Sequence, residues 1–161
     1  MLYLIMKRGT VTDARKRFDP QLYAENDAIA KDFIKNLLKG TAYQAIDNPK
    51  KRGVDLLIYK DSVHICNIEC EIKRVWKDSV FPYESVQIPV RKEKYAILEL
   101  PTIFTMLNGT QSDYLCFTSQ QMLASPKKEV PNKYVYKGEF FFQIDKNVVV
   151  FNDILKVLGN I

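Results

Sequence analysis

The sequence contains few of the residues on which several common kinds of active site depend. Its 161 residues include one histidine, three cysteines and one tryptophan. Cys66, Cys70 and Cys116 are odd in number, and their spacing fits neither a disulfide framework nor a zinc site. We expect buried free thiols, with the single histidine, His64, on the same apolar strand face as Cys66 and Cys70. Neither a Ser-His nor a Cys-His nucleophilic pair can be built from these residues.

Long apolar runs are also missing. The apolar start, residues 1–6, is followed by Lys7 and Arg8, which is the wrong length and charge order for a secretory signal. No apolar run approaches the length needed to cross a bilayer. We therefore expect a soluble, cytoplasmic protein without a membrane partner.

The charge is moderately basic. Lysine and arginine number 24 against 19 aspartate and glutamate, and the isoelectric point is about 9.0. This excess permits nucleic acid as a partner but does not require it. The basic residues gather in residues 7–17, which we expect to form an N-terminal arm within residues 1–18, in residues 50–52 and 74–77, and in residues 91–94.

One segment combines charged and apolar residues with a period of two. In residues 67–73, read as a strand, Asn67, Glu69, Glu71 and Lys73 fall on one face, and the apolar residues fall on the other. Two carboxylates and an ammonium are costly on a covered face unless a cation and an anion balance them. The pattern indicates either a metal-dependent phosphate site or a solvated sheet face.

A helix is expected before this segment. Asp19 suits the cap, Pro20 the first turn and Gly40 the exit. An apolar stripe predicts the buried face of this helix. Its members are Leu22, Ile29, Ala30, Phe33 and Leu37.

Strands are expected over residues 41–47, 54–59 and 63–74, with a tight turn at residues 60–62. A three-residue turn pairs odd positions with odd positions. It would place Asp55 opposite Asn67, on the face of Glu69 and Glu71.

Later elements are expected as a helix over 101–108, a strand over 113–118, a helix over 119–124 and a basic loop over 125–132. Two strands within 133–151 and a helix from cap Asn152 to Leu158 would complete the chain. We expect one α/β (α+β) domain over residues 1–161, with a central mixed β-sheet flanked by helices.

Asp55 and Glu71 are the candidate carboxylate ligands. Mg²⁺ prefers oxygen ligands and retains water, and it acts as a Lewis acid in phosphodiester hydrolysis. Lys73 would lie beside the bound water, where it could help to move a proton or stabilise developing negative charge.

An acid at Asp55, followed by a hairpin and then Glu71-Ile72-Lys73, resembles the PD-(D/E)xK nuclease superfamily. Val54 stands where the superfamily name has proline. The resemblance implies a restriction-endonuclease-like core, catalytic Asp55, Glu71 and Lys73, and a supporting glutamate on the preceding helix, Glu25. Glu69 is additional, either as the ligand of a second metal ion or as a carboxylate behind the direct ligands, and the acid pair can also be read one step earlier along the strand.

The resemblance also implies a function. It predicts a Mg²⁺-dependent endonuclease, with Mn²⁺ as a substitute, that cuts double-stranded DNA as a dimer or tetramer in a bacterial or phage-infected cell. Residues 81–92 look like those of phage-type and cyanobacterial homing endonucleases. A junction resolvase, an RNA-directed nuclease and a non-catalytic DNA-binding protein of the same fold remain alternatives. The expected DNA contacts are Lys50, Lys51, Arg52, Arg74, Gln87, Arg91 and Lys92.

Overall fold

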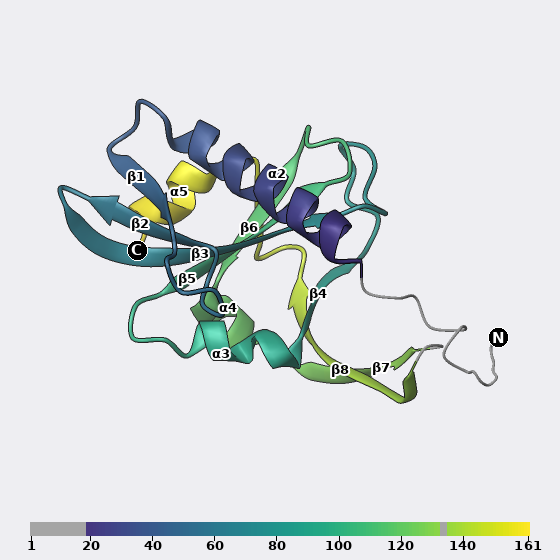
Figure 1. Cartoon of the computed structure of the whole chain (residues 1–161). Coiled ribbons are helices and arrows are strands. Elements are labelled where there is room, and N and C mark those ends of the chain that lie inside the picture. Colours follow the sequence, from purple (N-terminus) through teal and green to yellow (C-terminus); the bar gives the residue numbers. More distant parts are fainter. Residues whose placement is uncertain (1–18, 133–134) are drawn as a thin grey trace.

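The computed structural model of the chain describes residues 19–132 and 135–161, and it combines two β-sheets with one long helix and several short ones (Figure 1). The larger sheet has six strands in the order β1-β2-β3-β5-β6-β9, and the smaller has the order β4-β8-β7. The expected class, α+β with a mixed sheet, is confirmed. The proposed N-terminal arm lies outside the described residues.

The larger sheet consists of β1 (Tyr43–Asp47), β2 (Leu56–Lys60), β3 (Val63–Lys73), β5 (Thr102–Asn108), β6 (Tyr114–Thr118) and β9 (Val150–Phe151). The smaller sheet consists of β4 (Ser85–Pro89), β7 (Lys127–Asn132) and β8 (Val135–Asp145). The helices are α2 (Pro20–Leu38), the 3-10 turn η1 (Val90–Lys92), α3 (Glu93–Ala96), α4 (Ser119–Leu123) and α5 (Ile154–Gly159).

Helix α2 begins as its sequence predicts. The Asp19 carboxylate accepts hydrogen bonds from the backbone N–H groups of Gln21 and Leu22, which satisfies two donors of the first turn. The predicted stripe is confirmed in part, because Ala30 is buried and Phe33 and Leu37 are partly buried against the same core. Ala30, Ile34 and Leu38 are buried against the sheet, at a spacing of one helical turn. Leu22 and Ile29, which were assigned to this stripe, are exposed.

The β2–β3 hairpin keeps the predicted parity for a different reason. Its turn has two residues, Asp61 and Ser62, and not the three that were expected. A two-residue turn by itself pairs odd positions with even ones. A bulge in β3 then shifts the pairing from Tyr59↔His64 to Ile58↔Cys66 and restores odd-with-odd pairing. Asp55 therefore lies just before β2, one position beyond Leu56↔Ile68, on the side of Glu69 rather than Asn67.

The same bulge changes the place of His64. It lies before the bulge, so it shares a face with Asn67 instead of the apolar face expected from its even number. Its Nε2 lies 2.8 Å from Asn67 Oδ1, and its ring stacks on Tyr59. The expectation that all three cysteines are buried and free is confirmed.

Two segments were assigned to the wrong kind of structure. Residues 101–108 were expected to be helical, but Thr102–Asn108 is the fully buried strand β5, parallel to β3. A short apolar run fits a central strand as well as a helix. The basic loop expected over 125–132 contains β7, an edge strand, and edges tolerate lysine and proline.

The last helix begins one residue later than predicted. Asp153, rather than Asn152, caps α5 by accepting a hydrogen bond from the Lys156 backbone N–H. The Asn152 side chain instead accepts from the Tyr114 backbone N–H, with its own φ at 56°.

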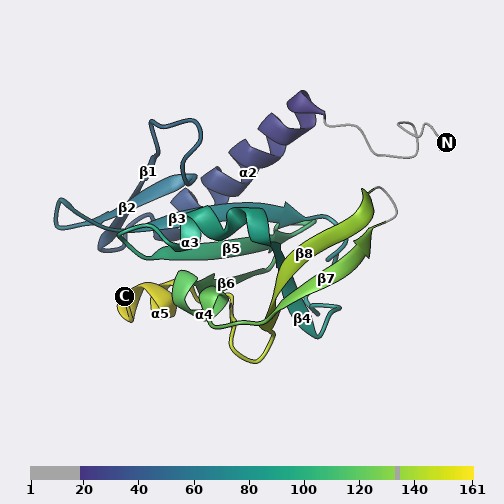
Figure 2. The same cartoon turned by 90° about the horizontal axis from the view of Figure 1, so that it is seen from below.

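Each face of the larger sheet has its own apolar core. Helices α2 and α5 cover one face, where Ile34 and Leu158 pack on Ile68 and Cys116. The smaller sheet, α3 and α4 cover the other, where Phe142 and Met122 meet Phe104 and Phe117. Figure 2 shows β4, β7 and β8 together at one end of the larger sheet. The odd-numbered face of β3 is thus a partly covered surface, not a solvated one.

Among residues 19–132 and 135–161, the structure contains no helix with the length and apolar character required to cross a membrane.

Candidate active site

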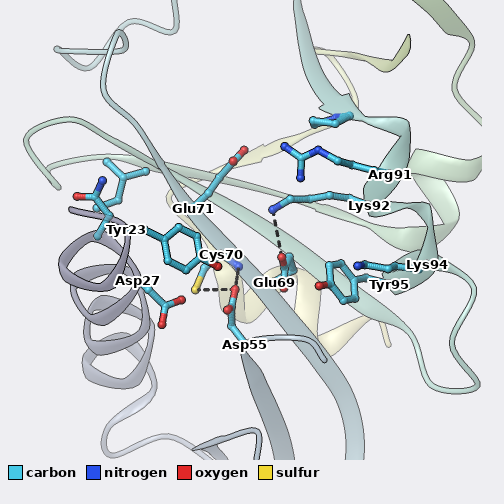
Figure 3. Close-up of a pocket in the computed structure, with 13 residues that line it drawn as sticks. Tyr23, Asp27, Asp55, Glu69, Cys70, Glu71, Arg91, Lys92, Lys94 and Tyr95 are labelled. Carbon is cyan, nitrogen blue, oxygen red and sulfur yellow. Dashed lines mark hydrogen bonds and ion pairs between the residues drawn. The ribbon is translucent and has the colours of Figure 1, made fainter. Parts of the chain in front are cut away.

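A cavity of about 360 Å³ opens between α2, β3 and the segment of η1 and α3 (Figure 3). We call it the acid cavity. Asp27 and Tyr23 enter from α2, and Arg91 and Lys92 enter from the opposite side (Figure 3). The carboxyl groups that line it are Asp27, Asp55, Glu69 and Glu71.

Hairpin geometry places Asp55 against β3. Its Oδ2 accepts a hydrogen bond of 2.9 Å from the Cys70 backbone N–H and lies 3.7 Å from Cys70 Sγ. Asp55 comes before the first residue of β2, so its side chain reaches the part of β3 that β2 does not pair with. Asp55 and Glu69 consequently lie beside one another, and we call them the carboxylate pair.

Glu69 is the most heavily buried acid of this cavity, with 8% of its surface exposed. Burial, together with the negative charge of Asp55, raises the pKa of Glu69 to about 8. Its Oε1 atom is buried and accepts no hydrogen bond from the described residues. A buried carboxyl oxygen without a donor is costly when the group is ionised, which favours the protonated form of Glu69.

Lys92 is the counter-ion of Glu69. Its Nζ lies 3.1 Å from Glu69 Oε2, and its side chain is only 18% exposed. Burial opposes its charge, but the surrounding carboxylates, Glu71 and Glu69 foremost, outweigh this effect and raise the pKa of Lys92. The ammonium therefore remains protonated and balances one negative charge of the cavity. Lys92 was predicted as a DNA contact, and its ion pair with Glu69 was missed.

Asp55 also has a raised pKa, chiefly because it is buried; the Cys70 N–H opposes the shift and the charge of Asp27 adds to it. Two neighbouring carboxyl groups with raised pKa values retain a proton between them near neutrality when no cation is bound.

The acid that α2 contributes is Asp27, not Glu25. Glu25 is exposed and does not line the acid cavity, whereas Asp27 does. Helical spacing explains the difference, because Asp27 lies three residues before the buried Ala30 and so faces the sheet. With the stripe assigned correctly to Ala30, Ile34 and Leu38, the sequence would have indicated Asp27.

Lys73 does not reach the carboxylate pair. Glu71 lines the acid cavity, but Lys73 lines a separate cavity, where its Nζ lies 5.6 Å from the centre of the Tyr83 ring. The lysine in contact with the carboxylates is Lys92, which comes from the segment after β4. The pairing expected between Glu71 and Lys73 is thus replaced by Glu69 with Lys92.

The other predicted DNA contacts are spread over the surface. Arg91 lines the acid cavity, and its exposed guanidinium lies 3.6 Å from Glu139. Arg74 donates to Asn26 on α2 and to the Gly109 carbonyl, so it ties β3 to its neighbours. Gln87 lines the same cavity as Lys73. Lys50, Lys51 and Arg52 are exposed in the β1–β2 connection and do not line the acid cavity.

The donor set suits a divalent cation in part. Within the described residues, no three side chains of the His, Cys, Asp or Glu types are grouped closely enough to hold a metal ion. The carboxylate pair nevertheless offers adjacent oxygens, one of them unpartnered, and Mg²⁺ commonly takes one or two carboxylates and completes its shell with water and phosphate. The pair therefore fits a Mg²⁺ site that substrate would complete.

The sequence matches no model of a known protein family and no curated protein.

Proposed function

We propose that this protein is a nuclease that hydrolyses phosphodiester bonds of DNA at the acid cavity with the help of a divalent cation. The observation that carries the proposal is the buried carboxylate pair, in which Glu69 Oε1 has no donor while Lys92 holds Glu69 Oε2. Such a pair can exchange its shared proton for a cation, and the basic residues at its rim suit an anionic substrate.

Asp55 and Glu69 are the residues that would hold the cation. When bound, it would supply a Lewis acid beside the phosphate and lower the pKa of an attacking water. Lys92 would lie within reach of the same phosphate and stabilise negative charge on it. Glu71 lines the cavity next to the pair and would orient water, while Arg91 and Lys94 at the rim would hold flanking phosphates.

The PD-(D/E)xK resemblance supports this proposal when the motif is read one step earlier along β3, so that its acids are Asp55 and Glu69 instead of Asp55 and Glu71. Asp55 precedes a strand of the hairpin, Glu69 lies on the next, and Asp27 takes the place proposed for the helix acid. Glu71 then occupies the position of the motif lysine, and Lys92 provides the ammonium from elsewhere. A restriction-endonuclease-like core, a homing-endonuclease role and a dimer or tetramer belong to the same proposal.

A second candidate is a DNA-binding protein that has the fold without catalysis. Two observations favour it: Lys73 lies outside the acid cavity, and the described residues form no three-ligand metal group. In this case Lys92 would serve as the permanent counter-ion of Glu69, and DNA would bind without being cut.

The two candidates are separated by whether the protein cuts DNA, and a matched pair of lysine substitutions tests the role of Lys92. Purified wild type, Lys92→Met, Lys73→Met, Asp55→Asn and Glu69→Gln are incubated with a pooled duplex library with and without Mg²⁺ or Mn²⁺, and new ends are sequenced. We expect metal-dependent cleavage that falls at least about 100-fold in Lys92→Met, Asp55→Asn and Glu69→Gln, but less than about 10-fold in Lys73→Met.

A thermal-unfolding measurement gives a second readout that does not depend on activity. Mg²⁺ or Mn²⁺ should raise the Tm of wild type and of Lys73→Met, but not that of Asp55→Asn, because the cation binds only the folded pair. Salt-sensitive DNA binding without cleavage under any metal would reject the nuclease and favour the second candidate. Equal cleavage by Lys92→Met and wild type would reject the assigned role of Lys92.

A further inference from the structure

A second cavity of about 330 Å³ lies at the end of β3, beside the acid cavity. We call it the Lys73 cavity. Phe81 and Tyr83 line it, with ring centres 5.6 Å apart at an angle of 73°. Phe81 is anchored by an edge contact with the buried Trp76, whereas Tyr83 is 43% exposed. One wall is thus a fixed aromatic surface with an accessible ring at its opening.

The remaining walls combine apolar and polar side chains. Val86 of β4 and Met106 of β5, which both belong to the apolar core, line the cavity together with Glu84, Ser85 and Gln87. The Gln87 side chain carries both an amide donor and a carbonyl acceptor, the pattern that pairs with the edge of a nucleobase. Lys73 adds an ammonium group over the Tyr83 ring.

The two cavities are linked by one strand. Glu71 lines the acid cavity and Lys73 the second, and both side chains leave β3 on the same face. Two residues of a strand span about 6.7 Å. Met106 of β5, paired with Glu71, lines the Lys73 cavity as well. A nucleotide whose phosphate lies at the acid cavity would therefore carry its base, or that of its neighbour, to the Lys73 cavity.

We propose that the Lys73 cavity binds one unpaired nucleobase of the DNA strand that lies across the acid cavity, with stacking on Tyr83 and hydrogen bonding to Gln87. The inference rests on the proposed function and narrows its substrate to DNA with a base displaced from its stack. A paired base cannot fill the cavity, because both its faces and its pairing edge are occupied in the duplex. Lys73 is then a substrate-binding residue and not a partner of the carboxylates.

The test compares three labelled duplexes of the same sequence: fully paired, with a one-nucleotide bulge, and with an abasic residue in the same bulge. Dissociation constants are measured by fluorescence anisotropy in EDTA, so that no strand is cut. We expect the bulged duplex to bind about 10-fold more tightly than the abasic one, since stacking of a base on an aromatic residue contributes on this scale. Tyr83→Ala and Gln87→Leu should reduce this ratio towards one.

Two controls separate the cavity from general binding or folding effects. Tyr83→Phe retains the ring and should keep the ratio, and Phe140→Ala removes an exposed ring elsewhere and should also keep it. Equal binding of the bulged and abasic duplexes would overturn the inference, as would a ratio unchanged by both Tyr83→Ala and Gln87→Leu.

The outcome also distinguishes this inference from the proposed function. Cleavage with metal but no base preference would reject the base site alone. A base preference that depends on Tyr83 and Gln87, with no cleavage under Mg²⁺ or Mn²⁺, would reject the nuclease and retain the base site. Absence of DNA binding would reject both.

Discussion

At the scale of single residues, the distinctive feature is a carboxyl group whose surroundings favour its neutral form. Glu69 has a buried environment, the neighbouring Asp55 and, among the residues that the structure describes, one cationic partner, Lys92. Burial and like charge both disfavour ionisation, and one ammonium does not offset them. Without a bound cation, Glu69 therefore keeps its proton in the folded protein at a pH where it loses that proton in the unfolded chain.

This difference predicts how stability depends on pH. The pKa of Glu69 rises from an ordinary 4.5 to about 8 on folding, so between these values the folded state binds more protons than the unfolded state. Without divalent cations, the free energy of unfolding should fall as pH rises from about 4.5 to about 8, by up to about 1.4 kcal/mol per pH unit from this group. Asp55 acts in the same direction, and Lys92 titrates above this range.

Urea unfolding followed by circular dichroism at several pH values would measure this slope. The glutamine of Glu69→Gln cannot ionise, so this variant should show a clearly flatter profile. The control is Asp32→Asn, which removes an exposed carboxylate of α2 that has no hydrogen bond or ion pair with the described residues. This control should match wild type. Identical slopes in wild type and Glu69→Gln would contradict the assigned cause.

The sequence identified the residues of the site better than their partnerships. Glu69 and Glu71 were predicted because alternation along one strand is a local property, and Asp55 was predicted from the pairing of a hairpin, which is nearly as local. The ion pair of Lys92 and the place of Asp27 were missed because these contacts depend on how the segment after β4 and the helix α2 pack on the sheet. Side chains that meet across 23 residues, as Lys92 and Glu69 do, leave no periodic signal in the chain.

At the scale of elements, the β2–β3 hairpin controls whether the site forms. Its two-residue turn and its bulge together decide which residue of β3 faces Asp55. Asp61 and Ser62 both have positive φ, at 51° and 64°, as the central residues of a type I′ turn do. Neither residue is a glycine, so the turn is held in a conformation that costs free energy.

Relief of this cost is predicted to stabilise the protein. Ser62→Gly should raise the free energy of unfolding by about 0.5–1 kcal/mol, because glycine adopts positive φ without strain. Ser62→Ala is the matched control and should give no gain, since alanine retains the Cβ atom. Chemical denaturation at one pH would measure both, and an equal gain from alanine would show that turn strain is not the cause.

The two elements that were predicted wrongly both lack the alternation of a half-exposed strand, each for its own reason. β5 is apolar on both faces because it is covered on both sides, so it lacks the alternation that marks a half-exposed strand. The β7 strand is polar and contains proline because it lies at a sheet edge. Helix α2 and strands β1 to β3 were predicted nearly in full, because local capping and turn residues mark where they begin and end.

At the scale of the whole molecule, the acid cavity is a negative centre with a basic rim in a chain of net charge +5. Arg91 and Lys94 are exposed at this rim. If DNA crosses the cavity, each phosphate that they neutralise should contribute about 0.9 to the slope of log K against log salt concentration. The joint Arg91→Ala and Lys94→Ala variant should therefore lower that slope by about two.

Anisotropy titrations of one duplex over a range of salt concentrations would measure the slope. The matched control is Lys39→Ala with Lys60→Ala, which removes the same charge from exposed residues outside the acid cavity. Equal reductions in both double variants would indicate a diffuse charge effect and place the DNA elsewhere.

The parallel pairing of β3 with β5 has a consequence for how such a protein can diversify. Parallel neighbours need a long crossover, and here residues 74–101 form it. The crossover carries the whole basic side of the acid cavity and much of the Lys73 cavity, whereas the acids come from the hairpin and α2. If the proposed function holds, changes of length or sequence in this segment outside Lys92 would alter which DNA is bound while the larger sheet and its carboxylates stay intact, so target choice would vary separately from bond-breaking chemistry.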